Sequence, residues 1–185
     1  MKRIACLLPL CILLSGCGAS DKPMEEALAL RGKVLASGCN FQCEITADYI
    51  DTLEVFTLDC VANLDGTLDF TVVAPESIAG ITGSTDEEEG ALTFDDVILG
   101  FPLMADDRIS PVSAPWLLIH TLKSGCITAC VREGDGLHMT IDDSYADDAL
   151  TLDIWTDSSL APISAEISWQ GRRVVSMQVE GFAYL

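Results

Sequence analysis

The sequence predicts an α+β fold: a curved antiparallel β-sheet, or half-barrel, of about ten strands with one or two helices against its concave face. Apolar and polar residues alternate from residue 38 to the end, turn residues interrupt the alternation at short intervals, and only the segment 113–125 carries clear helix signals. Such alternation gives a sheet one solvated face. One short helix cannot cover the other face of a flat sheet this large, so we expect the sheet to curl around its apolar side.

The first three strands can be placed in register from their turns. We expect Asp51-Thr52 to form a two-residue turn, which pairs Cys43 with Cys60 and keeps apolar residues on one face. Directly opposed thiols at this separation can close a disulfide, so Cys43 and Cys60 are disulfide candidates. A three-residue loop at Asp65-Gly66-Thr67 then sets Cys60 against Val72.

The later elements follow from local signals. Leu92-Thr93-Phe94 and Val97-Ile98-Leu99 flank two aspartates and predict a small hairpin. The helix has Ser113 as its expected N-cap, an apolar face including Leu117, and Gly125 as its stop. Alternating strands then continue to the end of the chain.

The N-terminus has the pattern of a bacterial lipoprotein export signal. Lys2 and Arg3 precede an apolar run, 4–14, which ends in Leu-Ser-Gly and then Cys17. We expect diacylglycerol, with acyl chains such as palmitate, on the Cys17 thiol, which would anchor the protein at the extracytoplasmic face of the cell membrane. Cleavage without lipidation and an uncleaved anchor are the alternatives.

Three segments follow from this interpretation. Residues 1–16 would be the signal peptide, 17–37 a lipidated tether, and 38–185 the half-barrel domain. The stretch 24–35 is rich in Ala, Leu and Glu, which leaves a short helix and a continued linker both open.

The chain is strongly acidic, with a net charge of −19. This charge repels nucleic acid and anionic headgroups, so no nucleic-acid partner is expected and the acyl anchor must hold the protein at the membrane. Solubility explains the acidity better than cation binding does.

Metal and cofactor sites are not expected. The sequence has eight cysteines, of which Cys6 and Cys11 would leave with the signal peptide and Cys17 would be lipidated. Five thiols would then remain: Cys39, Cys43, Cys60, Cys126 and Cys130. Two Cys-x3-Cys spacings occur within strands, where residues i and i+4 lie about 13 Å apart and cannot hold one ion.

Catalytic motifs are also missing from the sequence, which indicates a protein that is not an enzyme. His120 and His138 have no neighbouring motif, and we interpret them as ordinary packing or surface residues. The four Asp-Asp pairs, at 95–96, 106–107, 142–143 and 147–148, stand where turns are expected. Trp116, Trp155 and Trp169 fit core or rim packing better than sugar stacking.

The order of elements resembles a known superfamily. A lipobox, a curved meander of strands, the stretch Ala74-Pro75-Glu76-Ser77-Ile78-Ala79-Gly80-Ile81, a Leu-Thr-Phe-Asp-Asp hairpin, the 110–125 helix and closing strands are similar to LolA-like and LppX/LprG-like lipoproteins. The resemblance implies an unclosed barrel with a lid helix that holds acyl chains in an apolar cavity. The lipidation signal and the cysteines depart from the soluble carriers of this superfamily.

These observations predict a membrane-anchored lipoprotein that binds a lipid or acyl chain in its half-barrel. The expected cavity lining is Phe41, Ile45, Phe56, Leu58, Phe70, Val72, Leu117, Met139, Ile141, Leu152 and Ile154. The same residues could instead form a filled core. The alternative function is a noncatalytic structural or regulatory envelope protein that uses the fold to bind a protein partner.

Overall fold

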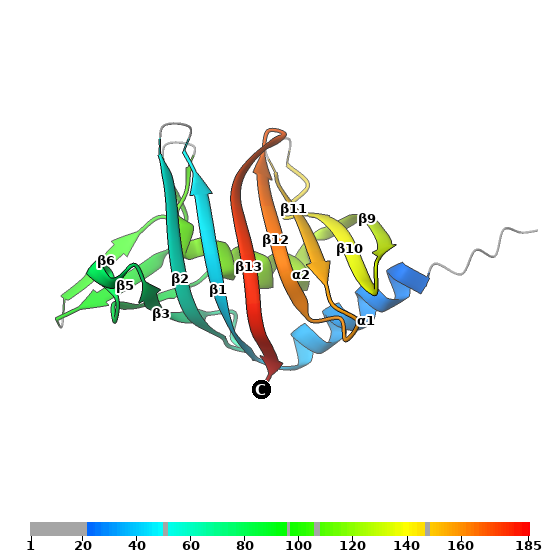
Figure 1. The fold of residues 1–185 in the computed structure, drawn as a ribbon, viewed down its shortest axis with the longest axis horizontal. Coiled ribbons are helices and arrows are strands. Elements are labelled where there is room, and N and C mark those ends of the chain that lie inside the picture. Colours follow the sequence, from blue (N-terminus) through cyan, green and yellow to red (C-terminus); the bar gives the residue numbers. More distant parts are fainter. Residues whose placement is uncertain (1–21, 50–51, 96, 106–107, 147–148) are drawn as a thin grey trace, which may run out of the picture.

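The fold is an open, arched antiparallel sheet with two helices beneath it (Figure 1). The computed structural model describes residues 22–49, 52–95, 97–105, 108–146 and 149–185. The helices are α1 (Lys22–Ala36) and α2 (Ala114–Ser124), with 3-10 turns at Glu76–Ile78 and Pro111–Ser113. The strands are β1 (Cys39–Asp48), β2 (Leu53–Ala62), β3 (Leu68–Ala74), β4 (Thr82–Thr85), β5 (Gly90–Phe94), β6 (Val97–Phe101), β7 (Met104–Ala105), β8 (Arg108–Ile109), β9 (Cys126–Glu133), β10 (Gly136–Asp142), β11 (Leu150–Thr156), β12 (Pro162–Trp169) and β13 (Arg172–Tyr184).

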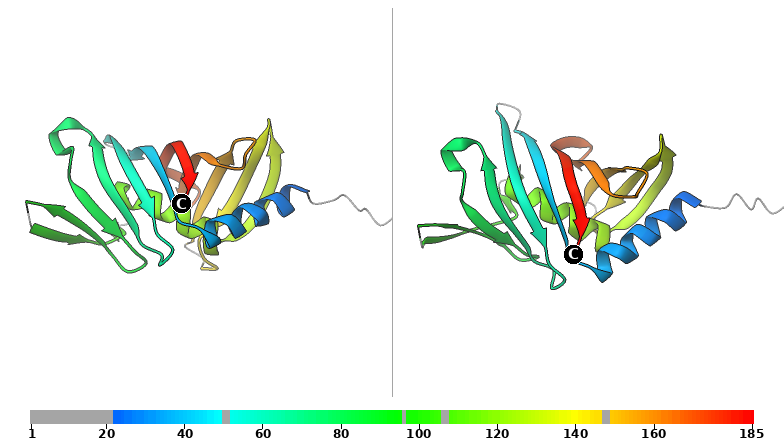
Figure 2. Two further views of the ribbon diagram at one scale, coloured as in Figure 1. Left: turned by 90° about the horizontal axis from the view of Figure 1, so that it is seen from below. Right: turned by 60° about the horizontal axis from the view of Figure 1, so that its bottom comes forward.

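The main sheet has eleven strands in the order β6-β5-β4-β3-β2-β1-β13-β12-β11-β10-β9. All its neighbours are antiparallel, and β7 and β8 form a separate small hairpin. Seen from below, the strands form an arch with both helices on its concave side (Figure 2). The predicted fold class is therefore confirmed.

Helix α2 fills the middle of the concave face. Eight of its eleven residues are buried, among them Leu117 and Leu118. Gly125 follows the helix as predicted. Ser113 stands at the N-cap position as predicted, but it does not cap the helix through its side chain. Its buried hydroxyl has no hydrogen-bond partner. The 3-10 turn Pro111–Ser113 leads into the helix instead.

Helix α1 contains the stretch 24–35, for which the sequence left helix and linker open. Ala27, Leu30 and Val34, spaced three and four residues apart, form its buried face. Arg31 donates from Nε to the Leu122 carbonyl at 2.8 Å and from Nη2 to the Gly125 carbonyl at 2.7 Å. The guanidinium thus supplies partners for carbonyls at the C-terminal end of α2 and joins the two helices.

The expected register of the first three strands is wrong by two residues at both turns. Cys43 pairs with Leu58 rather than Cys60, and Cys60 pairs with Phe70 rather than Val72. At the second turn, the Asp65 carboxylate accepts bonds from the backbone N–H and hydroxyl of Thr67, which stabilises a longer loop. An even shift preserves the face of every side chain, so the apolar face was predicted correctly although its pairs were not.

Among the described residues, neither helix is long and apolar enough to cross a membrane.

Candidate functional site

The concave face carries all eleven residues predicted to line a cavity. Ten of them are buried, with exposed fractions of 0–6%, and only Phe56 is half-buried. Leu117 belongs to α2, and the other ten lie on the strands above it. The ten buried side chains therefore pack together with α2 in one hydrophobic core, which does not include Phe56.

The apolar face continues beyond this core onto the β5–β6 hairpin. Cross-strand pairs put Leu92 opposite Leu99 and Phe94 opposite Val97, all on the face that also carries Phe70. Leu92 packs against the core, whereas Phe94, Val97 and Leu99 are 58%, 57% and 62% exposed. Figure 2 shows this hairpin projecting from the arch, away from α1. We name these three residues the hairpin patch.

Two glycines shape the approach to the hairpin patch. A Cβ at Gly83 would lie 2.4 Å from the Phe70 ring, and one at Gly90 would lie 2.1 Å from the Phe101 ring. Each aromatic ring therefore lies close against the glycine opposite it, where a Cβ would not fit.

A hollow of about 800 Å³ lies on the opposite, outer face of β1 to β5. Side chains that point away from the apolar inner face, such as Asn40, Asp69 and Thr71, contribute to its walls. The hollow therefore opens on the side of the sheet opposite the inner face.

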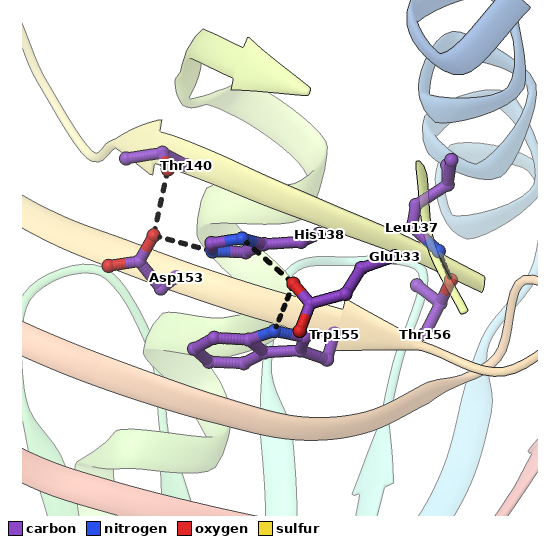
Figure 3. A network of polar contacts seen from close by, with 7 residues as sticks. All are labelled: Glu133, Leu137, His138, Thr140, Asp153, Trp155 and Thr156. Carbon is purple, nitrogen blue, oxygen red and sulfur yellow. Dashed lines mark hydrogen bonds and ion pairs between the residues drawn. The ribbon is translucent and has the colours of Figure 1, made fainter. Parts of the chain in front are cut away.

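A polar cluster that the sequence did not indicate lies on the outer face of β10 and β11 (Figure 3). His138 Nε2 lies 2.9 Å from Asp153 Oδ1, and its Nδ1 lies 3.4 Å from Glu133 Oε2. Thr140 donates its hydroxyl to Asp153 at 2.7 Å. The imidazole also stacks on the Trp155 indole, with ring centroids 4.4 Å apart and planes inclined by 9°.

This cluster orders side chains rather than forming a nucleophile–base pair. The Thr140 hydroxyl is bound to the Asp153 carboxylate, not to an imidazole nitrogen. The indole N–H of Trp155 donates to Glu133 at 3.2 Å, so the indole is held at its edge and on one face. Within the described residues, no group of three or more His, Cys, Asp or Glu side chains has the arrangement of a metal site. The other histidine, His120, stacks on Trp116.

Three cysteines lie within the core. Cys43 and Cys60 are thiols with sulfur atoms 3.9 Å apart, in diagonal rather than directly paired positions. The hydrogen bond between them and then burial raise the pKa of Cys60 well above its ordinary value. Burial raises the pKa of Cys39 to about 11, partly opposed by the charge of Lys123. Cys39 and Cys60 therefore stay protonated at neutral pH.

The remaining predicted positions divide into two groups. Asp142 and Asp143 accept bonds from the Thr151 hydroxyl and the Leu150 N–H, which agrees with the expected turn role. Cys17, residues 1–21 and the Asp-Asp pairs at 106–107 and 147–148 lie outside the described residues, as does residue 96.

No family model and no curated protein matches this chain. Solved structures similar to it include an uncharacterised conserved protein from Thermus thermophilus, at 16% identity and TM-score 0.48, covering 88% of this chain and 87% of that one. A second is a LolA superfamily protein from Nitrosomonas europaea, at 9% identity and TM-score 0.44, covering 84% of this chain and 92% of that one. A third is the lipoprotein LppX from Mycobacterium tuberculosis, at 10% identity and TM-score 0.40, covering 88% of this chain and 96% of that one. Structures of the superfamily indicated by the element order are thus among those that the chain resembles.

Proposed function

We propose that this protein is a membrane-anchored extracytoplasmic lipoprotein that binds a lipid acyl chain, or a similar apolar ligand, along the inner face of its half-barrel. The observation that carries the proposal is the continuity of the apolar inner face from the buried core to the exposed hairpin patch. Large apolar side chains grouped at the open end of such a face are a typical binding feature.

The energetics favour an acyl chain over a compact ligand. Each methylene removed from water contributes about 0.8 kcal/mol, so a chain that covers four methylenes on the hairpin patch gains roughly 3 kcal/mol. Deeper burial requires movement of side chains or of α2, because the inner face beneath α2 is filled. We therefore propose that the hairpin patch is the entry point and α2 the lid.

The test is binding of a fluorescent fatty acid to the double variant Val97→Gln/Leu99→Gln. We expect its affinity to fall at least tenfold, because two apolar contacts are replaced by amides that prefer water. The matched control is Leu53→Gln/Val55→Gln, which changes the same residue types at exposed positions of the outer face of β2. Equal binding by both variants, or no binding by the unmodified chain, would contradict the proposal.

The anchor is tested separately. Cells labelled with an alkyne analogue of palmitate should incorporate it into the full chain but not into the Cys17→Ser variant. The variant should also leave the membrane fraction. Labelling that persists in Cys17→Ser would place the lipid on another residue.

A second function, binding of an envelope protein, is favoured by the position of β6. It is the last strand of the sheet on its side, and Val97, Ile98 and Leu99 expose apolar side chains on both faces. Such an edge can pair with a strand of another protein. A photo-crosslinker at residue 98, on the outer face, distinguishes the two: a protein adduct supports strand pairing, and its absence alongside lipid binding supports the first function.

A further inference from the structure

A second hollow, of about 340 Å³, lies on the outer face beside Trp155. Its volume is at the small end of the roughly 300–1,000 Å³ range of ligand pockets. It is lined by Trp155, Ile163, Ser164, Ala165, Glu166, Ser176 and Gln178. We name it the Trp155 slot.

The strand pairing explains why a slot exists here. Trp155 on β11 pairs with Ser164 on β12, and Ser164 pairs with Gln178 on β13. A short side chain thus stands between two long ones in one row across the sheet. Neighbouring strands are about 4.8 Å apart, so the walls of the slot are separated by about 10 Å, with Ser164 as its floor.

The Trp155 indole, which forms one wall of the slot, is held in place by neighbouring side chains without any ligand. One face of Trp155 is covered by His138, which Asp153 and Glu133 hold, and the indole N–H is bound to Glu133. Figure 3 shows the two rings stacked on the β10 side of the indole, so its second face is turned toward β12 and the slot. A rigid aromatic face loses little conformational freedom when a ligand stacks on it.

We propose that the Trp155 slot binds a neutral saccharide. The face of an indole carries the negative part of its quadrupole and attracts the slightly positive C–H groups of a pyranose ring. The polar lining residues Ser164, Ser176 and Gln178 each offer both a donor and an acceptor, as sugar hydroxyls require. Hydrogen bonds and a stacked apolar face thus come together at one small site.

Charge distinguishes a saccharide from other ligands. The Glu166 carboxylate is already paired with Arg173 at 2.6 Å, so it does not leave a negative site for a cation. A cage for a quaternary ammonium group uses several aromatic walls, whereas the lining of the slot includes only Trp155. The net charge of −19 disfavours an anionic glycan.

The slot does not depend on the proposed function, because it lies on the outer face and the acyl-chain site on the inner face. The protein could therefore hold a neutral envelope glycan and an apolar ligand at the same time.

The test is calorimetric titration of the full chain with chitotetraose and with maltotetraose. We expect at least one to bind, with affinity reduced tenfold or more in Trp155→Ala. Ser164→Tyr keeps the indole but fills the slot, and it should abolish binding without unfolding the protein. Trp169→Phe is the control and should bind normally.

Three outcomes would overturn the proposal: neither saccharide binds, binding survives Ser164→Tyr, or tetramethylammonium binds the slot in place of the sugars. Fatty-acid binding measured on Ser164→Tyr separates the two sites, because it should be unchanged.

Discussion

The two ends of the inner face have the same strand pattern but different surroundings. Toward β9, alternate residues such as Leu152 and Ile154 are covered by the helices and have no exposed surface. At the β5–β6 end, the hairpin patch continues the same face and is more than half exposed. The two helices leave this end of the sheet open (Figure 2).

Alternation of apolar and polar residues thus predicts which side chains share a face of the sheet, but not which elements cover that face. How much of the inner face is buried depends on the length and position of the helices that pack against it. Burial stabilises the fold at the covered end, whereas the exposed apolar residues at the open end are available for binding. Substitutions of equal size should therefore have unequal effects at the two ends.

The largest contrast should come from Leu152→Ala and Leu99→Ala. The first leaves a cavity in the hydrophobic core and should lower the free energy of unfolding by about 2–5 kcal/mol. The second removes an exposed side chain and should change it by less than about 0.5 kcal/mol. Urea denaturation measures both; similar losses would mean that the hairpin patch is part of the core.

Arg31→Met tests what holds α2 in place. The guanidinium donates to two carbonyls at the C-terminal end of α2, and the variant should lose about 1–2 kcal/mol of stability. Hydrogen exchange should speed up in the last turn of α2. Lys33→Met, on the same helix, is the control, and an equal loss there would show that Arg31 has no special role.

The buried Cys39 thiol on β1 should make the stability of the fold depend on pH. Its pKa is raised by burial from 9.0 to about 11, so the folded state keeps the proton more tightly than the unfolded chain. The contribution of the protonated Cys39 thiol to the free energy of unfolding is complete below pH 9 and is lost as the pH rises to about 11. Cys39→Ala should flatten the fall in stability over this interval, as measured by urea denaturation at a series of pH values; an unchanged slope would contradict this prediction.

The smallest effect concerns a buried hydroxyl of α2. Thr121 is fully buried, and its hydroxyl has no hydrogen-bond partner. Thr121→Val keeps the shape and removes an unsatisfied group, so stability should rise by about 1 kcal/mol. Thermal unfolding measures this, with the half-buried Thr151→Val, which loses a bond to Asp142, as a control expected to be destabilised.

The sequence was sufficient for the features set by periodicity. The period of two placed Leu58 and Phe70 on the inner face, and helix signals located the segment ending at Gly125. The pairing of β5 with β6 also followed, because Phe94 and Val97 flank a short turn.

Features that depend on loop geometry and on distant contacts could not be predicted. The Asp65 carboxylate accepts two hydrogen bonds from Thr67, which stabilises a longer loop and places β3 two residues away from the expected register. The pairing of Asp153 with His138 across two strands becomes visible only once β10 and β11 are in register. Helix α1 lacked a boundary signal, and its place in the core depends on contacts with α2, such as those of Arg31.

If an acyl chain lies along the inner face and enters at the hairpin patch, photo-crosslinking of the full chain with a diazirine-bearing fatty acid, followed by peptide mapping, should detect it there. We expect adducts on residues 90–101 and on α2, and their loss in Val97→Gln/Leu99→Gln. Adducts confined to the outer face of β11 to β13, or none above the level of an unlabelled control, would contradict this expectation.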